Sequence, residues 1–130
     1  MHRPSGVAVD AGDNLYVADT LNHRIQTFNA RDDFQLEFGE EGSGAGLLES
    51  PHGLAVDDRG VLLVADTGNN RIEAFDLRGR FLAEIHDLGG AAGPLRQPTG
   101  IAVAGDRVYV ADTGNNRIVR LTLSVTPGSR

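Results

Sequence analysis

Val64-Ala-Asp-Thr-Gly-Asn-Asn-Arg-Ile72 is the stretch that decides the fold of this chain, because the sequence contains it three times. The same nine residues recur unchanged at 110–118, and a close variant, Val-Ala-Asp-Thr-Leu-Asn-His-Arg-Ile, occupies 17–25. Each copy follows a Pro-x-Gly-hydrophobic-Ala-Val run, and the three aspartates are 47 and 46 residues apart. A fixed period of this length is the signature of a repeat architecture.

Within each repeat the apolar residues come in short bursts separated by turn formers, which indicates strands rather than helices. In the second repeat this pattern predicts strands over 53–57, 61–66, 71–76 and 81–85. The connecting turns are so short that neighbouring strands must be antiparallel. The first two strands are almost continuously apolar, which predicts that both of their faces are covered. The outer strands alternate, as at 34–38, and are expected to meet water.

A four-stranded sheet that recurs at this spacing and is covered on both faces is a propeller blade stacked between other blades. The 130 residues are therefore expected to form one all-β domain of three blades, over 4–50, 51–97 and 98–125. The third blade has no counterpart of the outer strands at 34–38 and 81–85, and Pro127 and Gly128 read as a terminator. Its outer edge is expected to be unpaired.

The Pro-x-Gly-hydrophobic-Ala-Val-Asp opening, the Val-Ala-Asp-Thr-x-Asn-x-Arg-Ile core and the glycine-rich linker at 38–46 resemble NHL repeats over essentially the whole chain. This resemblance implies a β-propeller, commonly of six blades. It leaves the function open, because the family includes RNA-binding regulators, sensor domains of receptor kinases and a peptidyl-amide lyase.

Three blades cannot close a ring, since closed propellers have about four to eight. An open arc would expose two apolar blade faces. Two copies of the chain would supply the six blades that the resemblance implies, so we expect a homodimer closed by two head-to-tail contacts. The alternative is that the chain is half of a longer polypeptide, as its start only three residues before the first repeat also suggests.

The turn after the second strand and the linker before the first strand are expected on one face, here called the top face. Loops at such a rim or at the channel mouth are the usual ligand sites of propellers. A structural role competes with this one, because Asn and Asp favour tight turns and Arg can pair with the repeated Asp. The candidate binding residues on this face are His23, His52, Thr99, Asn69, Asn70, Arg71, Asn115, Asn116 and Arg117.

An enzymatic alternative comes from the resemblance alone. In the peptidyl-amide lyase of this fold, histidines at the heads of inner strands hold zinc, and the matching positions here are Ser5, His52 and Thr99. A catalytic zinc site needs about three protein ligands, so one histidine predicts no metal site, and we assign no catalytic residue and no cofactor. Calcium-dependent lactonase-type propellers also exist, but no acidic cluster identifies such a site. The linker at 39–46 is expected to be flexible and is not a phosphate-binding loop.

The amino-acid composition limits the classes of partner that this chain is expected to bind. The 12 basic residues face 18 acidic ones, for a net charge of -6, which makes nucleic acid an unlikely ligand. The chain has no cysteine, no signal peptide and no apolar stretch long enough for a membrane span, and its compartment stays open. The sequence thus predicts a scaffold that binds a protein, peptide or small molecule. The alternatives are a lyase or hydrolase with its site in the channel, or half of a larger sensor or RNA-binding propeller.

Overall fold

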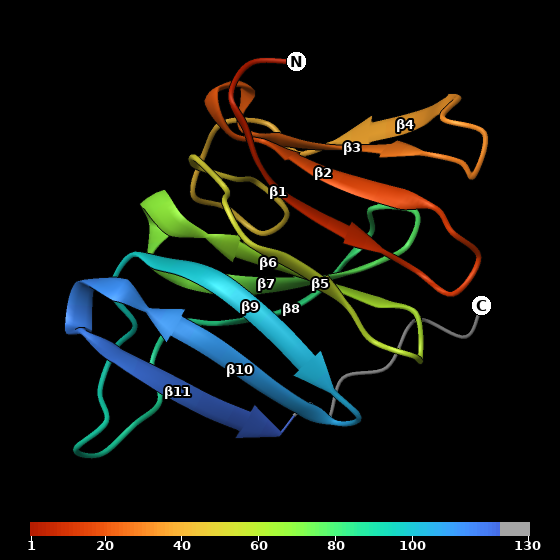
Figure 1. The fold of residues 1–130 in the computed structure, drawn as a ribbon. Coiled ribbons are helices and arrows are strands. Elements are labelled where there is room, and N and C mark those ends of the chain that lie inside the picture. The colour runs from red at the N-terminus through yellow and green to blue at the C-terminus, as the bar shows by residue number, and fades with distance from the viewer. Residues whose placement is uncertain (123–130) are drawn as a thin grey trace.

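The structure is a computed structural model of the chain, and it describes residues 1–122. Its strands form three antiparallel sheets that follow one another face to face, so that the second sheet lies between the other two (Figure 1). The all-β, bladed architecture expected from the sequence is confirmed. Among the described residues no helix is long and apolar enough to span a membrane.

Each sheet is a meander whose strands follow chain order. The first contains β1 (Pro4–Val9), β2 (Leu15–Asp19), β3 (Arg24–Phe28) and β4 (Phe34–Phe38). The second contains β5 (Leu54–Val56), β6 (Val61–Asp66), β7 (Arg71–Asp76) and β8 (Phe81–Ile85). The third contains β9 (Pro98–Ala104), β10 (Arg107–Asp112) and β11 (Arg117–Thr122). A short 3-10 helix follows the second strand of each sheet: η1 (Thr20–Asn22), η2 (Thr67–Asn69) and η3 (Thr113–Asn115).

The predicted strands of the second repeat agree with the structure except for the first, which is two residues shorter. Asp57 leaves the strand because its Oδ1 accepts hydrogen bonds from the backbone of Arg59 and Val61 and so caps the turn. The third sheet has three strands among the described residues. Residues 123–125 of the predicted third blade, and the predicted terminator, lie outside those residues.

The core consists of two apolar layers, one on each side of the second sheet. Leu62 and Val64 of β6 face the first sheet, where they meet residues such as Tyr16. The alternate residues Leu63 and Ala65 face the third sheet. Every residue of β6 is buried, so the prediction of a strand covered on both faces is confirmed in the middle blade.

The outer faces of the terminal blades are uncovered in the described structure. Val7 and Val9 of β1 are 64% and 56% exposed, and Ile118 of β11 is 69% exposed. The corresponding residues of the middle blade, Leu54 and Ile72, are 6% and 3% exposed. The exposed faces are those predicted for an arc that does not close by itself.

Glycines allow the inner strands of neighbouring blades to approach closely. A Cβ on Gly6 would lie 2.0 Å from the carbonyl oxygen of His52, and one on Gly53 would lie 2.3 Å from that of Thr99. Both distances are far below van der Waals contact. Gly100 occupies the same position in the third blade, yet its Cβ would meet only the Cβ of Ala111, at 3.5 Å.

We therefore expect Gly53→Ala to destabilise the chain and Gly100→Ala to leave its folding intact. The new methyl at residue 53 must push two inner strands apart, which should lower the free energy of unfolding by about 1–3 kcal/mol. Urea denaturation monitored by circular dichroism measures this difference. Equal losses in the two variants, measured where both are single chains, would show that blade-to-blade approach within the chain is not what Gly53 serves.

Candidate functional site

A buried aspartate ends the second strand of every blade and gathers the top-face turn around itself. The Oδ2 atoms of Asp19, Asp66 and Asp112 accept from an arginine Nε at 2.8, 2.7 and 2.7 Å. The same oxygens accept from an asparagine amide at 3.0, 2.9 and 2.9 Å. The Oδ1 atoms accept a backbone N–H from the preceding linker at 2.6, 2.7 and 2.7 Å. Burial by itself raises the pKa of Asp19 and Asp112, but these hydrogen bonds outweigh it and lower the pKa.

The same turns also bind each blade to the next. Thr20 Oγ1 donates to the carbonyl of Pro51, and Thr67 Oγ1 to that of Pro98, both at 2.7 Å. The residue after each 3-10 helix has a left-handed backbone, and in the first two blades its side chain accepts an N–H from the following linker. His23 Nδ1 accepts from Ser50 at 2.9 Å, and Asn70 Oδ1 accepts from Gln97 at 2.8 Å. We call this set of contacts the blade joint.

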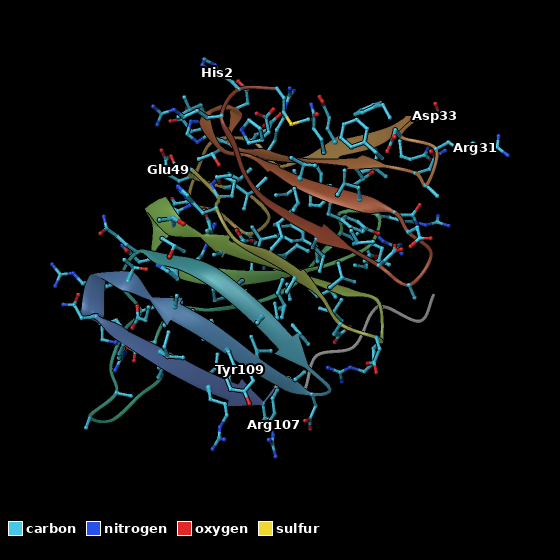
Figure 2. All side chains as sticks on the ribbon, in the orientation of Figure 1. His2, Arg31, Asp33, Glu49, Arg107 and Tyr109 are labelled. Atoms are coloured by element: carbon cyan, nitrogen blue, oxygen red, sulfur yellow. The ribbon has the colours of Figure 1, made fainter. Side chains whose placement is uncertain are left out.

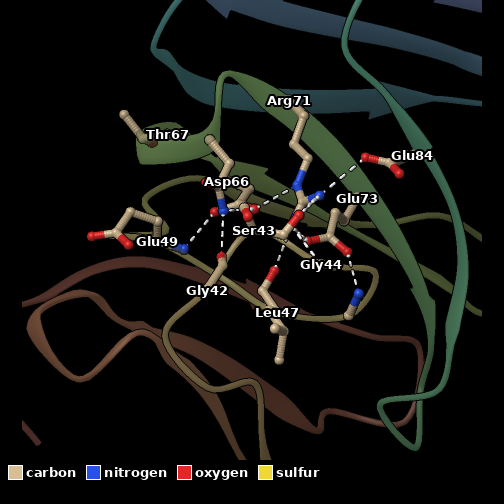
Figure 3. A network of polar contacts seen from close by, with 12 residues as sticks. Gly42, Ser43, Gly44, Leu47, Glu49, Asp66, Thr67, Arg71, Glu73 and Glu84 are labelled. Atoms are coloured by element: carbon tan, nitrogen blue, oxygen red, sulfur yellow. Dashed lines mark hydrogen bonds and ion pairs between the residues drawn. The ribbon is translucent and has the colours of Figure 1, made fainter.

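The middle blade contains the largest polar network, which is centred on Arg71 (Figure 3). Its guanidinium contacts the carboxylates of Asp66, Glu73 and Glu84 at 2.7, 2.8 and 3.1 Å. It also donates to the carbonyls of Ser43, Gly44 and Leu47, while Glu73 Oε1 accepts the N–H of Gly46 at 2.9 Å. The linker at 39–46 was expected to be flexible, but these bonds fix its path over the arginine.

Glu73 is the most perturbed carboxyl of this network. It is fully buried, and its Oε2 has no hydrogen bond although it lies beside the Arg71 guanidinium. Burial, reinforced by the neighbouring Asp66, raises the pKa of Glu73 from 4.5 to about 8. One arginine faces three carboxyls, so the network favours a proton on one of them.

A cavity of about 860 Å³ opens on the top face between the second and third blades. The segment between β8 and β9, drawn in Figure 1 as a long loop, forms one wall. The turns of the two blades form the other wall. The lining residues are Asn69, Asn70, His86, Ala91, Ala92, Gly93, Pro94, Leu95, Arg96, Asn115 and Arg117.

The heads of the inner strands form no metal site among residues 1–122. His52 Nδ1 lies 2.8 Å from the carbonyl of Ser50 and 3.1 Å from Thr67 Oγ1, while Thr99 hydrogen-bonds to Thr113 at 2.6 Å. The group in this part of the chain that could reach one ion is instead His23, Glu41 and Glu49. There Nδ1 of His23 already accepts the N–H of Ser50, so this nitrogen is occupied by the blade joint.

The three repeats match the NHL repeat over residues 1–28, 48–75 and 95–121, which together are more than half of the chain. The chain belongs to the NHL-repeat family. Among curated proteins it is similar to the protein brain tumor of Drosophila melanogaster, with 56% identity over 39 residues, which are 30% of this chain and 4% of that protein.

Solved structures share the fold of this NHL chain. Virginiamycin B lyase from Staphylococcus aureus superposes with a TM-score of 0.71 at 22% identity, covering 98% of this chain and 42% of that one. A gluconolactonase from Xanthomonas campestris gives 0.63 at 22% identity, with 85% and 35% covered. Hydrazine synthase from Kuenenia stuttgartiensis gives 0.67 at 20% identity, with 95% and 37% covered. The NHL chain thus spans less than half the length of these structures, and the likeness concerns the fold alone.

The structure shows how the candidate binding residues of the NHL repeats are engaged. Those of the first two blades hold the turns, the linkers and the blade joint: His23, His52, Asn69, Asn70 and Arg71. Asn69 and Asn70 also line the cavity, together with Asn115 and Arg117 of the third blade, whereas Thr99 bonds within its own blade. No side-chain bond of Asn116 is found among the described residues. That these positions bind a ligand stays a prediction.

Glu73 and the cavity-lining residues outside the repeated motif are not among the candidates that the sequence offered. Glu73 stands where the first blade has Gln26 and the third has Val119, so comparison of the three copies could have marked it. A lone acid in an apolar strand is a signal of a buried pair. Its partners on the linker could not be read from the sequence.

We expect Glu73→Gln to stabilise the chain increasingly as the pH rises. The pKa of Glu73 is higher in the folded chain than in the unfolded one, so its stabilising contribution is full below pH 4.5 and is lost as the pH rises through about 8. Glutamine mimics the protonated acid and never ionises. The free energy of unfolding of the variant minus that of the wild type should therefore grow by roughly 1–2 kcal/mol between about pH 5 and about pH 9.

Urea titrations at several pH values measure this difference. Gln35 is an exposed glutamine on β4, and Gln35→Glu is the control for an acid at a solvated position. A pH-independent difference for Glu73→Gln would contradict the raised pKa.

Proposed function

We propose that this NHL chain is a non-enzymatic binding scaffold that closes a six-bladed ring with a second copy of itself. The observation that supports closure is an unused half of the blade joint at each end of the arc. A ring would bury both apolar faces and display the top-face loops on a rigid frame. The ligand would then be a protein, a peptide or a small molecule held at the rim.

The third blade presents one half of the joint. Thr113 and Asn116 correspond to Thr67 and Asn70, which bind the next blade in the middle of the arc. Beside them lie the exposed Ile118 and Gly100, a glycine that no close contact within the described chain requires. A blade placed after the third would give each of these four residues the role that its counterpart has.

The first blade presents the matching half. Arg3 has φ of 59°, close to the 50° and 49° of Ser50 and Gln97, whose N–H groups are the donors of the existing joints. Its backbone is thus already shaped to donate to Asn116 of another copy. The carbonyl of Pro4 corresponds to the acceptor at Pro51, and Val7 and Val9 supply the apolar face.

Two such joints around a two-fold axis make a closed ring of three blades from each chain. Further blades of a longer polypeptide could use the same joint. In a solution of this chain alone, only self-association can complete the ring. Measurements on such a solution therefore test closure by a second copy separately from closure by further blades.

The scaffold proposal is favoured over the enzymatic alternative by the way the polar side chains of the top face are used. Most of them hold turns and linkers, and the inner-strand heads carry one histidine. The lyase and lactonase activities named for the similar structures are properties of those proteins. Stoichiometric metal in the purified chain, together with turnover of an amide or lactone substrate, would reject the scaffold proposal.

We expect the wild-type chain to have twice the mass of one chain in light scattering, and Gly100→Val to have the mass of one. In the arc the new Cβ would make only van der Waals contact, with the Cβ of Ala111 at 3.5 Å, so the variant should fold. In the ring it would meet the inner strand of the other copy, as a Cβ at Gly53 would meet Thr99.

Gly12→Val is the matched control, because Gly12 lies in the turn between β1 and β2, away from the joint. Circular dichroism confirms the fold of each variant. A wild-type chain that stays at the mass of one chain over a dilution series would contradict closure by self-association, and so would an undiminished dimer of Gly100→Val.

A further inference from the structure

The linkers that precede the second and third blades are equally long but follow different paths. The segments 39–51 and 86–98 both have 13 residues and align with an offset of 47. The first folds over Arg71, which donates to three of its carbonyls. The second makes no such contact with Arg117, although Arg117 is the counterpart of Arg71, and a cavity of about 860 Å³ lies between them.

One difference between the two blades lies two residues after each arginine. In the middle blade Glu73 binds the N–H of Gly46 and so anchors the linker over Arg71. In the third blade the same position is Val119, whose side chain cannot accept a hydrogen bond, and the N–H of Gly93 donates instead to the carbonyl of Gly89 at 3.2 Å. Without such an acid the linker does not fold over Arg117, whose side chain is 31% exposed.

Arg117 consequently retains unused hydrogen-bonding capacity. Its Nε is paired with Asp112 at 2.7 Å, but its buried Nη2 has no hydrogen-bond partner among residues 1–122. Nη1 makes no hydrogen bond among these residues either and, unlike Nη2, it is not shielded from solvent, so it is the donor that an anion in the cavity would meet. The Nη2 of Arg71 has both carbonyl acceptors and a carboxylate beside it.

The described side chains that line this cavity include no acid, although the carboxylate of Asp112 pairs with Arg117 at 2.7 Å. The lining includes Arg117, Arg96 and His86. A second cavity, of about 610 Å³ beside the first blade, is lined by Glu37, Glu40 and Glu41. The whole chain has a net charge of -6, so a cavity whose lining has basic but no acidic side chains differs from the rest of the molecule. Such a lining favours anions.

We propose that the cavity between linker 86–97 and the third blade binds a small organic molecule through a carboxylate or phosphate group. The guanidinium of Arg117 would take the oxyanion, with Arg96 adding charge at the rim. Ala91, Ala92 and Pro94 would pack against the apolar body of the ligand. The volume is that of pockets for drug-sized ligands. All lining residues come from one chain, so the site does not rest on ring closure.

Isothermal titration of the wild-type chain with benzoate and with phenyl phosphate tests this proposal, and the stronger binder shows which oxyanion the site prefers. Benzyl alcohol and benzylamine are the neutral and cationic controls, and neither should bind. Arg117→Lys keeps the charge but loses the planar fork, and should weaken anion binding about tenfold. Arg96→Gln should weaken it severalfold.

Arg31→Gln is the matched control, because Arg31 lies in the turn between β3 and β4, far along the chain from the cavity (Figure 2). It removes the same charge and should leave binding unchanged. Equal weakening by Arg31→Gln and Arg96→Gln would show a general effect of charge and overturn the proposal.

Val119→Glu provides a test that does not remove any cation. The new acid should take the N–H of Gly93 from the carbonyl of Gly89, draw the linker over Arg117 as Glu73 holds its linker over Arg71, and abolish binding. Backbone NMR shifts of residues 89–94 report the closure, and circular dichroism verifies the fold of each variant. The proposal is overturned if the wild-type chain binds neither anion at millimolar concentrations, or if benzyl alcohol binds as tightly as the anions do.

Discussion

The buried aspartate at the end of each second strand is the constraint on which the rest of the structure depends. A carboxylate without solvent is costly unless its oxygens are fully hydrogen-bonded. Asp66 meets this demand with the amide of Asn69, the guanidinium of Arg71 and the backbone of Glu49. These partners come from the turn, the next strand and the linker before the blade. One side chain therefore fixes three segments relative to one another, and the repeat applies this solution three times.

Small differences between the copies follow from what lies next to each turn. The second residue of the 3-10 helix is Gly68 in the middle blade, where a Cβ would lie 2.8 Å from the carbonyl oxygen of Glu49. The first blade has Leu21 there, 43% exposed, and its N–H lies 3.2 Å from the carbonyl oxygen of His2, whereas that of Gly68 lies 2.8 Å from the Glu49 carbonyl oxygen. His23 replaces asparagine in the same turn and still accepts a linker N–H. His23 was a candidate binding residue in the sequence, and in the structure it belongs to the blade joint.

The balance between acids and arginines varies along the chain, and the top face varies with it. Arg71 is surrounded by three carboxylates and a closed linker. Arg24 pairs with Asp19 and Glu37, whereas Arg117 pairs with Asp112 alone among the described residues. A repeated scaffold thus contains chemically different surfaces, because residues outside the repeated motif decide how each linker is held. The proposed contact with a second copy and the proposed anion site therefore use different surfaces of the third blade.

The sequence by itself determined the repeat, the antiparallel strands, the top-face turns and the family, because each of these is a local pattern written three times. It also predicted that two blade faces would lack cover, as the exposed Val9 and Ile118 show. Only the tertiary structure decided which repeated residues are used up as scaffold. Whether Arg71 or Arg117 has free donors depends on the path of the preceding linker and on a single buried acid at position 73. Arg71, for example, donates to the carbonyl of Leu47, which lies 24 residues earlier in the chain. Such contacts depend on distance in space, which the order of residues does not contain.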